Sequence, residues 1–289
     1  MYNISVIKSL LSENDLRVTK GLGQNFLIDR NVCRKIVSCS GFGVEDGVIE
    51  IGAGLGTLTS ELALEYRKVV AIEVDSRLIR VLHKTLRSFD NIKIINDDAL
   101  KIDFNKLISE EFIQCKRIVI CANLPFYITT PIVMHILENN NYLDGRLESM
   151  TLMVQKEAAQ RMTVLPGSRM CGAVTFAINF FSSPRRMFDV SKNCFFPAPN
   201  VDSSVIKLDL YGGKWFLVKD REFFFNIVRA AFFQRRKNLA NSLSQWLKLE
   251  KKKVSETLES IMISSCARPE SLSFEDFSKI SNTFFDIIF

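Results

Sequence analysis

Residues 48–59 read Val-Ile-Glu-Ile-Gly-Ala-Gly-Leu-Gly-Thr-Leu-Thr, and they decide how the rest of the chain is interpreted. The apolar start predicts a short buried strand over 48–51, and the pattern over 57–66 predicts a helix. Three glycines between them let the backbone approach a ligand closely at a helix N-terminus. Thr57 stands where a dinucleotide fingerprint places its third glycine. The stretch indicates a nucleotide-like cofactor, with a plain glycine turn as the alternative.

Strands and helices alternate after this stretch. Further strands are predicted near 68–73, 92–96, 117–122 and 149–155, with helices between them at 76–88, 131–138 and 156–162. Alternation of this kind predicts an α/β fold, a doubly wound and mostly parallel Rossmann-like sheet. Residues 185–190 and 203–210 are predicted to close the sheet edge as a hairpin.

The pair Gly212-Gly213 predicts a domain boundary. The α/β domain would cover residues 1–212, and a small all-α C-terminal domain would cover 213–289. In the second domain, helical patterns are predicted over Phe223–Leu249, Val254–Ile263 and Phe274–Phe289. A chain of 289 residues is long enough for one large and one small domain.

Composition excludes several classes of protein. Seven cysteines form no C-x-x-C pair and lie mostly in apolar surroundings, which favours reduced thiols in a cytosolic protein. Only two histidines occur, and neither lies near a cysteine or carboxylate cluster, so we expect no metal and no histidine acid–base catalysis. No apolar run approaches the ~20 residues of a membrane span. The N-terminus has no signal-peptide core. These features predict a cytoplasmic protein without a membrane partner.

Acidic residues follow two further strands. Glu73 ends the second strand, where an acidic side chain accepts the ribose hydroxyls of an adenosine. The third strand runs into Asn96-Asp97-Asp98-Ala99, where a carboxylate can accept from an adenine N6 amine and the next backbone N–H can serve N1. We expect one of the two aspartates to cap a helix and Asp98 to bind the ligand.

The fourth strand ends in Asn123-Leu124-Pro125-Phe126. The Asn123 side-chain oxygen and the Leu124 carbonyl can both accept from one exocyclic amine. Pro125 restricts the backbone on both sides, and the Phe126 ring offers a face on which a base can stack. A strand that ends in a proline turn is the alternative. A nicotinamide dehydrogenase would explain the glycines and Glu73 but not this tetrapeptide.

Charge is concentrated in one segment of the chain. The net charge is +6, and residues 213–253 hold eleven Lys and Arg against three Asp and Glu. Arg229, Arg236 and Lys237 would lie on nearly one side of the long predicted helix, where they suit phosphates. The segment therefore indicates an RNA partner, with a solvated surface helix as the alternative.

Several motifs together resemble the rRNA adenine N6-dimethyltransferase family, most closely its bacterial small-subunit branch. They cover nearly the whole chain: Gly23–Leu27, Glu50–Thr59, Val154–Arg161, Phe195–Ser203, Phe232–Lys237 and Asn241–Leu243. The resemblance implies a cofactor, S-adenosyl-L-methionine, bound by Asn25, Leu27, Gly52, Glu73, Asp98 and Asn123. Gly54 of the glycine stretch and Ala99, whose N–H follows Asp98, are expected to bind it as well. The resemblance also implies that Phe126 and Phe195 sandwich the target adenine. From the concentration of basic residues we expect Arg229, Arg235, Arg236 and Lys237 to bind the RNA. In two places the chain departs from the family pattern: Phe126-Tyr127 replaces the usual Tyr-Asn, and Cys171 replaces a common Tyr.

The resemblance implies dimethylation at N6 of two adjacent adenosines in the 3′-terminal hairpin loop of 16S rRNA. The partner would be small-subunit rRNA within a pre-30S particle, and the enzyme would act as a monomer. Three related alternatives remain at this stage. They are a large-subunit adenine dimethylase of the macrolide-resistance type, a mitochondrial relative acting in transcription, and a ribosome-assembly factor without activity.

Overall fold

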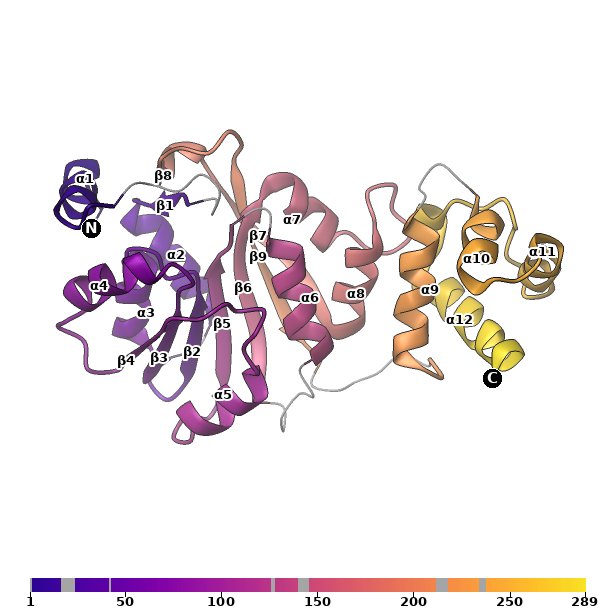
Figure 1. Ribbon diagram of the computed structural model, residues 1–289, viewed down its shortest axis with the longest axis horizontal. Helices are drawn as coiled ribbons and strands as arrows, with labels where there is room; N and C mark the ends of the chain where they lie inside the picture. The colour runs from indigo at the N-terminus through magenta and orange to yellow at the C-terminus, as the bar shows by residue number, and fades with distance from the viewer. Residues whose placement is uncertain are drawn as a thin grey trace. The chain divides into compact units, whose positions relative to one another are not determined.

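The computed structural model describes residues 2–16, 24–41, 43–125, 128–139, 146–211, 218–233 and 238–289 (Figure 1). The chain forms two compact units. The first holds Met1–Ala159 and Ser183–Gly213, and the second holds Gln160–Ser182 and Lys214–Phe289. The division after Gly213 lies beside the predicted boundary. Residues 160–182, which the sequence assigned to the first domain, belong instead to the second unit.

A seven-stranded sheet forms the centre of the first unit, in the order β4-β3-β2-β5-β6-β9-β7. Its strands are β2 (Gly47–Ile51), β3 (Lys68–Ile72), β4 (Ile92–Ile95), β5 (Ile118–Asn123), β6 (Leu147–Gln155), β7 (Ser182–Val190) and β9 (Ser203–Leu210). Strands β2 to β6 pair in parallel, and β9 pairs antiparallel with β6. The predicted doubly wound sheet is confirmed, and β9 and β7 form the edge where the hairpin was predicted.

Helices cover both faces of this sheet, which explains why β2 is buried along its whole length. The helices of this unit are α1 (Ile4–Glu13), α2 (Arg30–Ser40), α3 (Thr57–Glu65), α4 (Ser76–Thr85), α5 (Phe104–Glu111) and α6 (Thr129–Asn139). Helix α7 (Lys156–Thr163) spans the division between the two units. Helices α2 and α3 pack with Val48, Val69 and Val119 on one face. Right-handed crossovers place α5 and α6 on the other face, where the ring of Phe104 meets that of His135.

Aspartates start three of these helices. Asp29 accepts from the backbone N–H groups of Asn31 and Val32, and Asp75 accepts from that of Arg77. Asp103 caps α5 in the same way, through the N–H of Lys106. Helix α5 was not predicted, although Asp103 was its signal in the sequence.

The second unit is built from α8 (Ala173–Phe181), α9 (Arg221–Phe233), α10 (Leu239–Leu247), α11 (Lys251–Ser260) and α12 (Phe274–Ile288). Phe176 contacts Phe277 and Phe180 contacts Phe224, and all four rings are fully buried, so the phenylalanine-rich segments are core. The single helix predicted over 223–249 is wrong. Helix α9 ends at Phe233, and Asn238 caps the start of α10. Among the described helices, none has the length and apolarity to cross a membrane.

Gly47 provides a test of the packing at the start of β2. A Cβ at this position would overlap the fully buried ring of Phe112 and lie 3.2 Å from the Cys115 sulfur. Gly47→Ala is therefore expected to lower the free energy of unfolding by about 1–3 kcal/mol through overpacking. Gly43→Ala is the matched control, because a Cβ there meets nothing within 4 Å. Urea denaturation of both variants measures the effect, and equal stability of the two would contradict this account.

Candidate functional site

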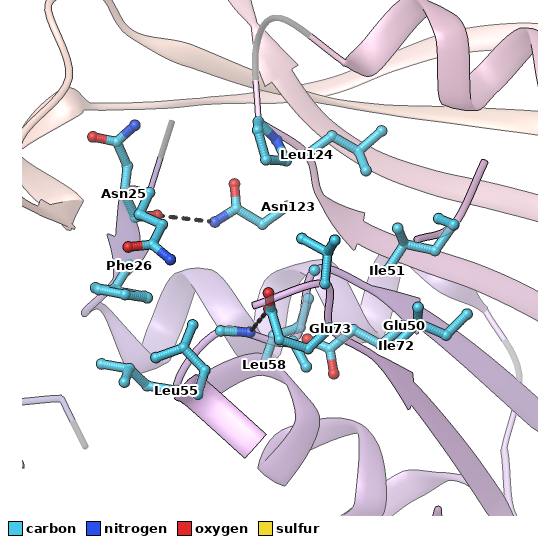
Figure 2. Close-up of a pocket in the computed structure, with 18 of the residues that line it drawn as sticks. Asn25, Phe26, Glu50, Ile51, Leu55, Leu58, Ile72, Glu73, Asn123 and Leu124 are labelled. Atoms are coloured by element: carbon cyan, nitrogen blue, oxygen red, sulfur yellow. Dashed lines mark hydrogen bonds between the residues drawn. The ribbon is translucent and has the colours of Figure 1, made fainter. Parts of the chain in front are cut away.

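A pocket opens in the first unit at the carboxyl ends of β2, β3, β4 and β5 (Figure 2). It encloses about 1060 Å³ of empty space, counted out to its open mouth. The residues predicted to bind the cofactor all line it: Asn25, Leu27, Gly52, Gly54, Glu73, Asp98, Ala99 and Asn123. Leu124, Pro125 and Phe195 line it too, whereas Phe126 and Tyr127 lie outside the described residues. Topology brings these groups together, because parallel strands end at one edge of the sheet.

The glycine loop has a backbone that other residues adopt only with strain. Gly52, Gly54 and Gly56 have φ angles of 79°, 59° and 84°. A Cβ on Gly54 would also approach the Phe26 ring to 3.2 Å. The loop ends at Gly56, which is the N-cap of α3. The three glycines thus fix the path of the loop beside the pocket.

Glu73, directly after β3, holds this loop and also lines the pocket. Its Oε2 accepts a hydrogen bond from the Gly54 N–H at 2.8 Å, and its Oε1 accepts one from the Asp75 N–H at 2.9 Å. The residue is only 6% exposed. Burial raises the pKa of its carboxyl, and the two backbone N–H groups act in the opposite direction. Each oxygen keeps a second lone pair, which a ribose hydroxyl can use.

The two aspartates after β4 make local backbone contacts. Asp97 Oδ1 accepts from the Asp98 N–H at 2.7 Å, and Asp98 Oδ1 accepts from the Leu100 N–H at 3.0 Å. Both residues line the pocket, beside the buried Ala99. Asp98 therefore combines a turn-stabilising contact with a place in the pocket wall.

Asn123 is the last residue of β5. Its side-chain Nδ2 donates to the Asn25 carbonyl at 3.3 Å, as the dashed line in Figure 2 shows. This contact assigns the nitrogen end of the amide, so Oδ1 is left as an acceptor. Next to it, the Leu124 N–H donates to the Met153 carbonyl, and the Pro125 carbonyl accepts from the Ile128 N–H. The backbone of this turn is thereby tied to β6 and to the start of α6.

A two-stranded sheet brings distant motifs together at the pocket. β1 (Phe26–Leu27) pairs antiparallel with β8 (Phe195–Phe196), with Leu27 opposite Phe195. The Ile28 N–H also donates to the Cys194 carbonyl at 2.9 Å. Phe195 is 4% exposed and lines the same pocket as Asn123. Periodicity does not reveal strands of two residues, so this pairing could not be predicted from the sequence.

The charge of the pocket favours a cationic ligand. The charged residues that line it are all acidic: Glu50, Glu73, Asp97 and Asp98. No Lys, Arg or His belongs to the lining described. A pyrophosphate would find no basic side chain in this lining, which favours a cofactor without phosphates. An adenosine compound that carries a positive charge fits both the acidic lining and the ribose acceptor at Glu73.

The predicted RNA-binding residues are only partly described. Arg229 is exposed on α9, and its guanidinium donates to Asn226 Oδ1 at 3.3 Å. Arg235, Arg236 and Lys237 lie outside the described residues, in the segment between α9 and α10. The expectation that Arg229, Arg236 and Lys237 share one side of a helix therefore stays a prediction.

A family model described as ribosomal RNA adenine dimethylase matches residues 16–285. The chain belongs to this family. The match covers both compact units and confirms the predicted family, enzyme class and dependence on S-adenosylmethionine.

The relatives of this dimethylase chain are similar over nearly their whole length. The ribosomal RNA small subunit methyltransferase A of Bacillus pumilus is 43% identical over 278 residues, covering 95% of this chain and 94% of the relative. A dimethyladenosine transferase from Plasmodium falciparum has a TM-score of 0.69 at 25% identity, covering 87% and 94% of the two chains. The 23S rRNA methyltransferase ErmE, at 24% identity and a TM-score of 0.64 over 90% and 99% of the chains, shares the fold.

Sequence reasoning missed some pocket residues of this member of the dimethylase family. Phe26, Leu55 and Leu78 line the pocket and pack with Ile7 and Leu11 of α1. Their signal in the sequence is the amphipathic spacing of Ile4, Ile7, Leu10 and Leu11, which does not show what the apolar side of α1 packs against. Glu50 was noted as part of the glycine stretch but given no role, although a carboxylate in an otherwise apolar strand is unusual.

Proposed function

We propose that the chain transfers methyl groups from S-adenosylmethionine to N6 of two adjacent adenosines in the 3′-terminal hairpin loop of 16S rRNA. The product is N6,N6-dimethyladenosine, formed during maturation of the small subunit. The observation that carries the proposal is the acidic pocket with Asn123 at the end of β5. The similarity to small-subunit methyltransferases over nearly the full chain supports the choice of RNA.

The cofactor would be held by residues from four strand ends. Glu73 accepts from the ribose hydroxyls, and Asp98 with the Ala99 N–H reads the adenine. Leu27 on β1 and Asn25 just before β1 cover the site. The Gly52–Gly54 loop passes close to the ligand. When bound, the cofactor supplies an electrophilic methyl group on a sulfonium.

Asn123 Oδ1 and the Leu124 carbonyl would accept hydrogen bonds from the target amine. Two acceptors on one amine favour a pyramidal nitrogen, whose lone pair then points away from them. Phe126 and Phe195 would stack on the extruded base, each contact contributing about 1–3 kcal/mol. Unstacking the base costs a few kcal/mol and favours a loop as the target site. Positioning supplies most of the catalysis, and no general base is required because a cationic nitrogen loses its proton readily.

The RNA would be bound as small-subunit rRNA within a pre-30S particle, by one copy of the chain in the cytoplasm. Arg229, Arg235, Arg236 and Lys237 would contact phosphates. The chain would recognise its target sequence in irregular or single-stranded RNA, since the grooves of an RNA duplex expose little of the base sequence to side chains.

Changing Arg235, Arg236 and Lys237 together to Gln should weaken RNA binding and flatten its dependence on salt. Each lost phosphate contact lowers the log–log slope by about 0.7–0.9. Cofactor affinity should not change, because the pocket lies in the other unit. Lys93, Lys106 and Lys116, all exposed and each paired with a glutamate, give a control triple of equal charge. Filter binding over a salt series measures both, and equal slopes for the two triples would contradict the RNA-binding role.

The nearest alternative is a large-subunit dimethylase, which shares the fold. Primer extension on small-subunit rRNA, with and without the protein and S-adenosylmethionine, separates the two. We expect reverse transcription to stop in the 3′-terminal hairpin loop only when both the protein and S-adenosylmethionine have been present. A stop confined to large-subunit rRNA, together with macrolide resistance of cells expressing the protein, would overturn the proposal in favour of the large-subunit dimethylase.

A further inference from the structure

Helix α4 and the turn after it carry a basic face that the reaction described above does not use. Residues 76–89 hold four Lys and Arg and no Asp or Glu, whereas residues 1–212 as a whole hold 25 Lys and Arg against 23 Asp and Glu. The four basic residues of this α4 face are Arg77, Arg80, Lys84 and Arg87, and all of them are exposed. The first three lie on one side of the helix, because they are three and four residues apart, and Arg87 follows in the turn. This short stretch therefore concentrates positive charge in a unit whose charges otherwise nearly balance.

The opposite side of α4 is fixed in the core of the first unit. Leu78 and Val81 pack with Ile7 of α1, and Leu82 packs with Ile94 of β4. Leu78 also lines the cofactor pocket. The α4 face is therefore held outward by a helix whose other side forms part of the pocket wall.

Two of the four basic side chains have a carboxylate partner and two have none. The ion pairs are Arg77–Asp75 at 2.6 Å and Lys84–Glu13 at 2.7 Å. Within the described part of the chain, neither Arg80 nor Arg87 is in ion-pair contact with a carboxylate. An exposed guanidinium without a carboxylate can donate two parallel hydrogen bonds to a phosphate. Arg80 and Arg87 are thus available to an anionic partner.

The make-up of the α4 face favours a phosphate backbone over a protein or a membrane. A protein interface buries apolar and aromatic side chains at its centre, but no large hydrophobic side chain is exposed along α4, which is described throughout. A helix that lies on a membrane needs its apolar side free, and here that side is packed in the core. Phosphates require only exposed positive charge, which this face supplies.

We propose that the α4 face binds phosphates of small-subunit rRNA outside the hairpin loop that carries the target adenosines, through Arg80 and Arg87. The inference rests on the proposed function. The target amine is placed at Asn123 on β5, and β2 separates β5 from β3, the strand that leads into α4. Neighbouring strands are about 4.8 Å apart, so the two strand ends are about 10 Å apart and the α4 face lies farther out. A nucleotide held at Asn123 therefore leaves the α4 face to another segment of the RNA.

Co-sedimentation of the full chain with small-subunit particles that lack the modification, over a salt series, tests this. Changing Arg80 and Arg87 together to Gln should weaken binding about three- to tenfold and lower the log–log salt slope by about 1.4–1.8 for two lost phosphate contacts. Gln forms helices well, and no carboxylate loses an ion-pair partner, so the fold should be kept. Changing both residues to Lys, which keeps the charge, should restore most of the affinity. The matched control changes Lys106 and Lys116 to Gln, an equal loss of charge at exposed lysines of the same unit that are each paired with a glutamate.

Binding of S-adenosylhomocysteine by the double Gln variant shows that it is folded. If its affinity for particles and its salt slope equal those of the control, the role of the α4 face is overturned and the proposed function stands. Weaker binding to particles with unchanged binding to protein-free small-subunit rRNA would show that the face contacts a protein, which also overturns the inference. Failure of wild type to bind either particles or this rRNA would overturn the proposed function itself. If the double variant does not bind S-adenosylhomocysteine, Arg80→Gln and Arg87→Gln are measured singly. Each should then lower the slope by about 0.7–0.9, and two unchanged slopes overturn the inference.

Discussion

Replacing Asn123 by Ala is expected to reduce methyl transfer by about 10²–10³-fold, the effect of removing one positioned polar contact at a reacting centre. The Asn123 oxygen is the proposed acceptor for the target amine, and its Nδ2 is already committed to the Asn25 carbonyl. Loss of the side chain removes this acceptor. It also removes the hydrogen bond to the Asn25 carbonyl, just before β1. Single-turnover transfer of labelled methyl groups to small-subunit particles measures the rate.

Two controls separate chemistry from recognition at Asn123. RNA affinity of Asn123→Ala should equal that of wild type, because the basic residues lie in the other unit. Asn123→Ser, which keeps a side-chain oxygen, should recover part of the rate. A near-normal rate for the Ala variant would show that the segment after β5 is only a proline turn.

Replacing Glu73 by Ala should damage both cofactor binding and stability. The ribose hydroxyls would lose a charged acceptor, at about 1.5–3 kcal/mol for each hydrogen bond, or roughly ten- to hundredfold in affinity. The Gly54 and Asp75 N–H groups would also lose their partner in a buried place, at about 1–3 kcal/mol each. Calorimetry with S-adenosylhomocysteine and urea denaturation measure the two effects.

Asp97→Ala is the matched control for Glu73→Ala, because Asp97 is an exposed carboxylate that lines the same pocket. Its effect on affinity and stability should be much smaller. Glu73→Gln should fall between the two, since its amide oxygen can still accept from one of the two backbone N–H groups. Unchanged affinity in Glu73→Ala would exclude this residue as the ribose acceptor.

The parallel sheet could be predicted because its strands are apolar and its helices are amphipathic, so periodicity marks both. The structure departs from the prediction where local signals are weak or conflict. The apolar spacing over residues 223–249 is that of one helix, yet Asn238 caps the start of a second helix within this range. Residues 160–182 join the second unit, because the phenylalanines of α8 pack with those of α9 and α12. A single sequence shows neither which apolar faces meet nor where a continuous pattern breaks.

The pocket could be predicted where one strand end supplies one group, as at Glu73 and Asn123. Contacts between distant segments were not visible, such as the pairing of Leu27 with Phe195 or the amide of Asn123 on Asn25. The burial of Glu50 was not visible either, because it depends on the elements packed around β2 rather than on the residue's position in the glycine stretch.

Counting dimethylated adenosines in small-subunit rRNA tests the proposed substrate and product. Small-subunit particles from cells lacking the modification would be incubated with the protein and S-adenosylmethionine, with large-subunit particles in parallel. The rRNA nucleosides would then be quantified by mass spectrometry. We expect about two N6,N6-dimethyladenosines per small subunit and none in large-subunit rRNA. Methylation of large-subunit rRNA instead, or no methylation of either RNA, would contradict the account.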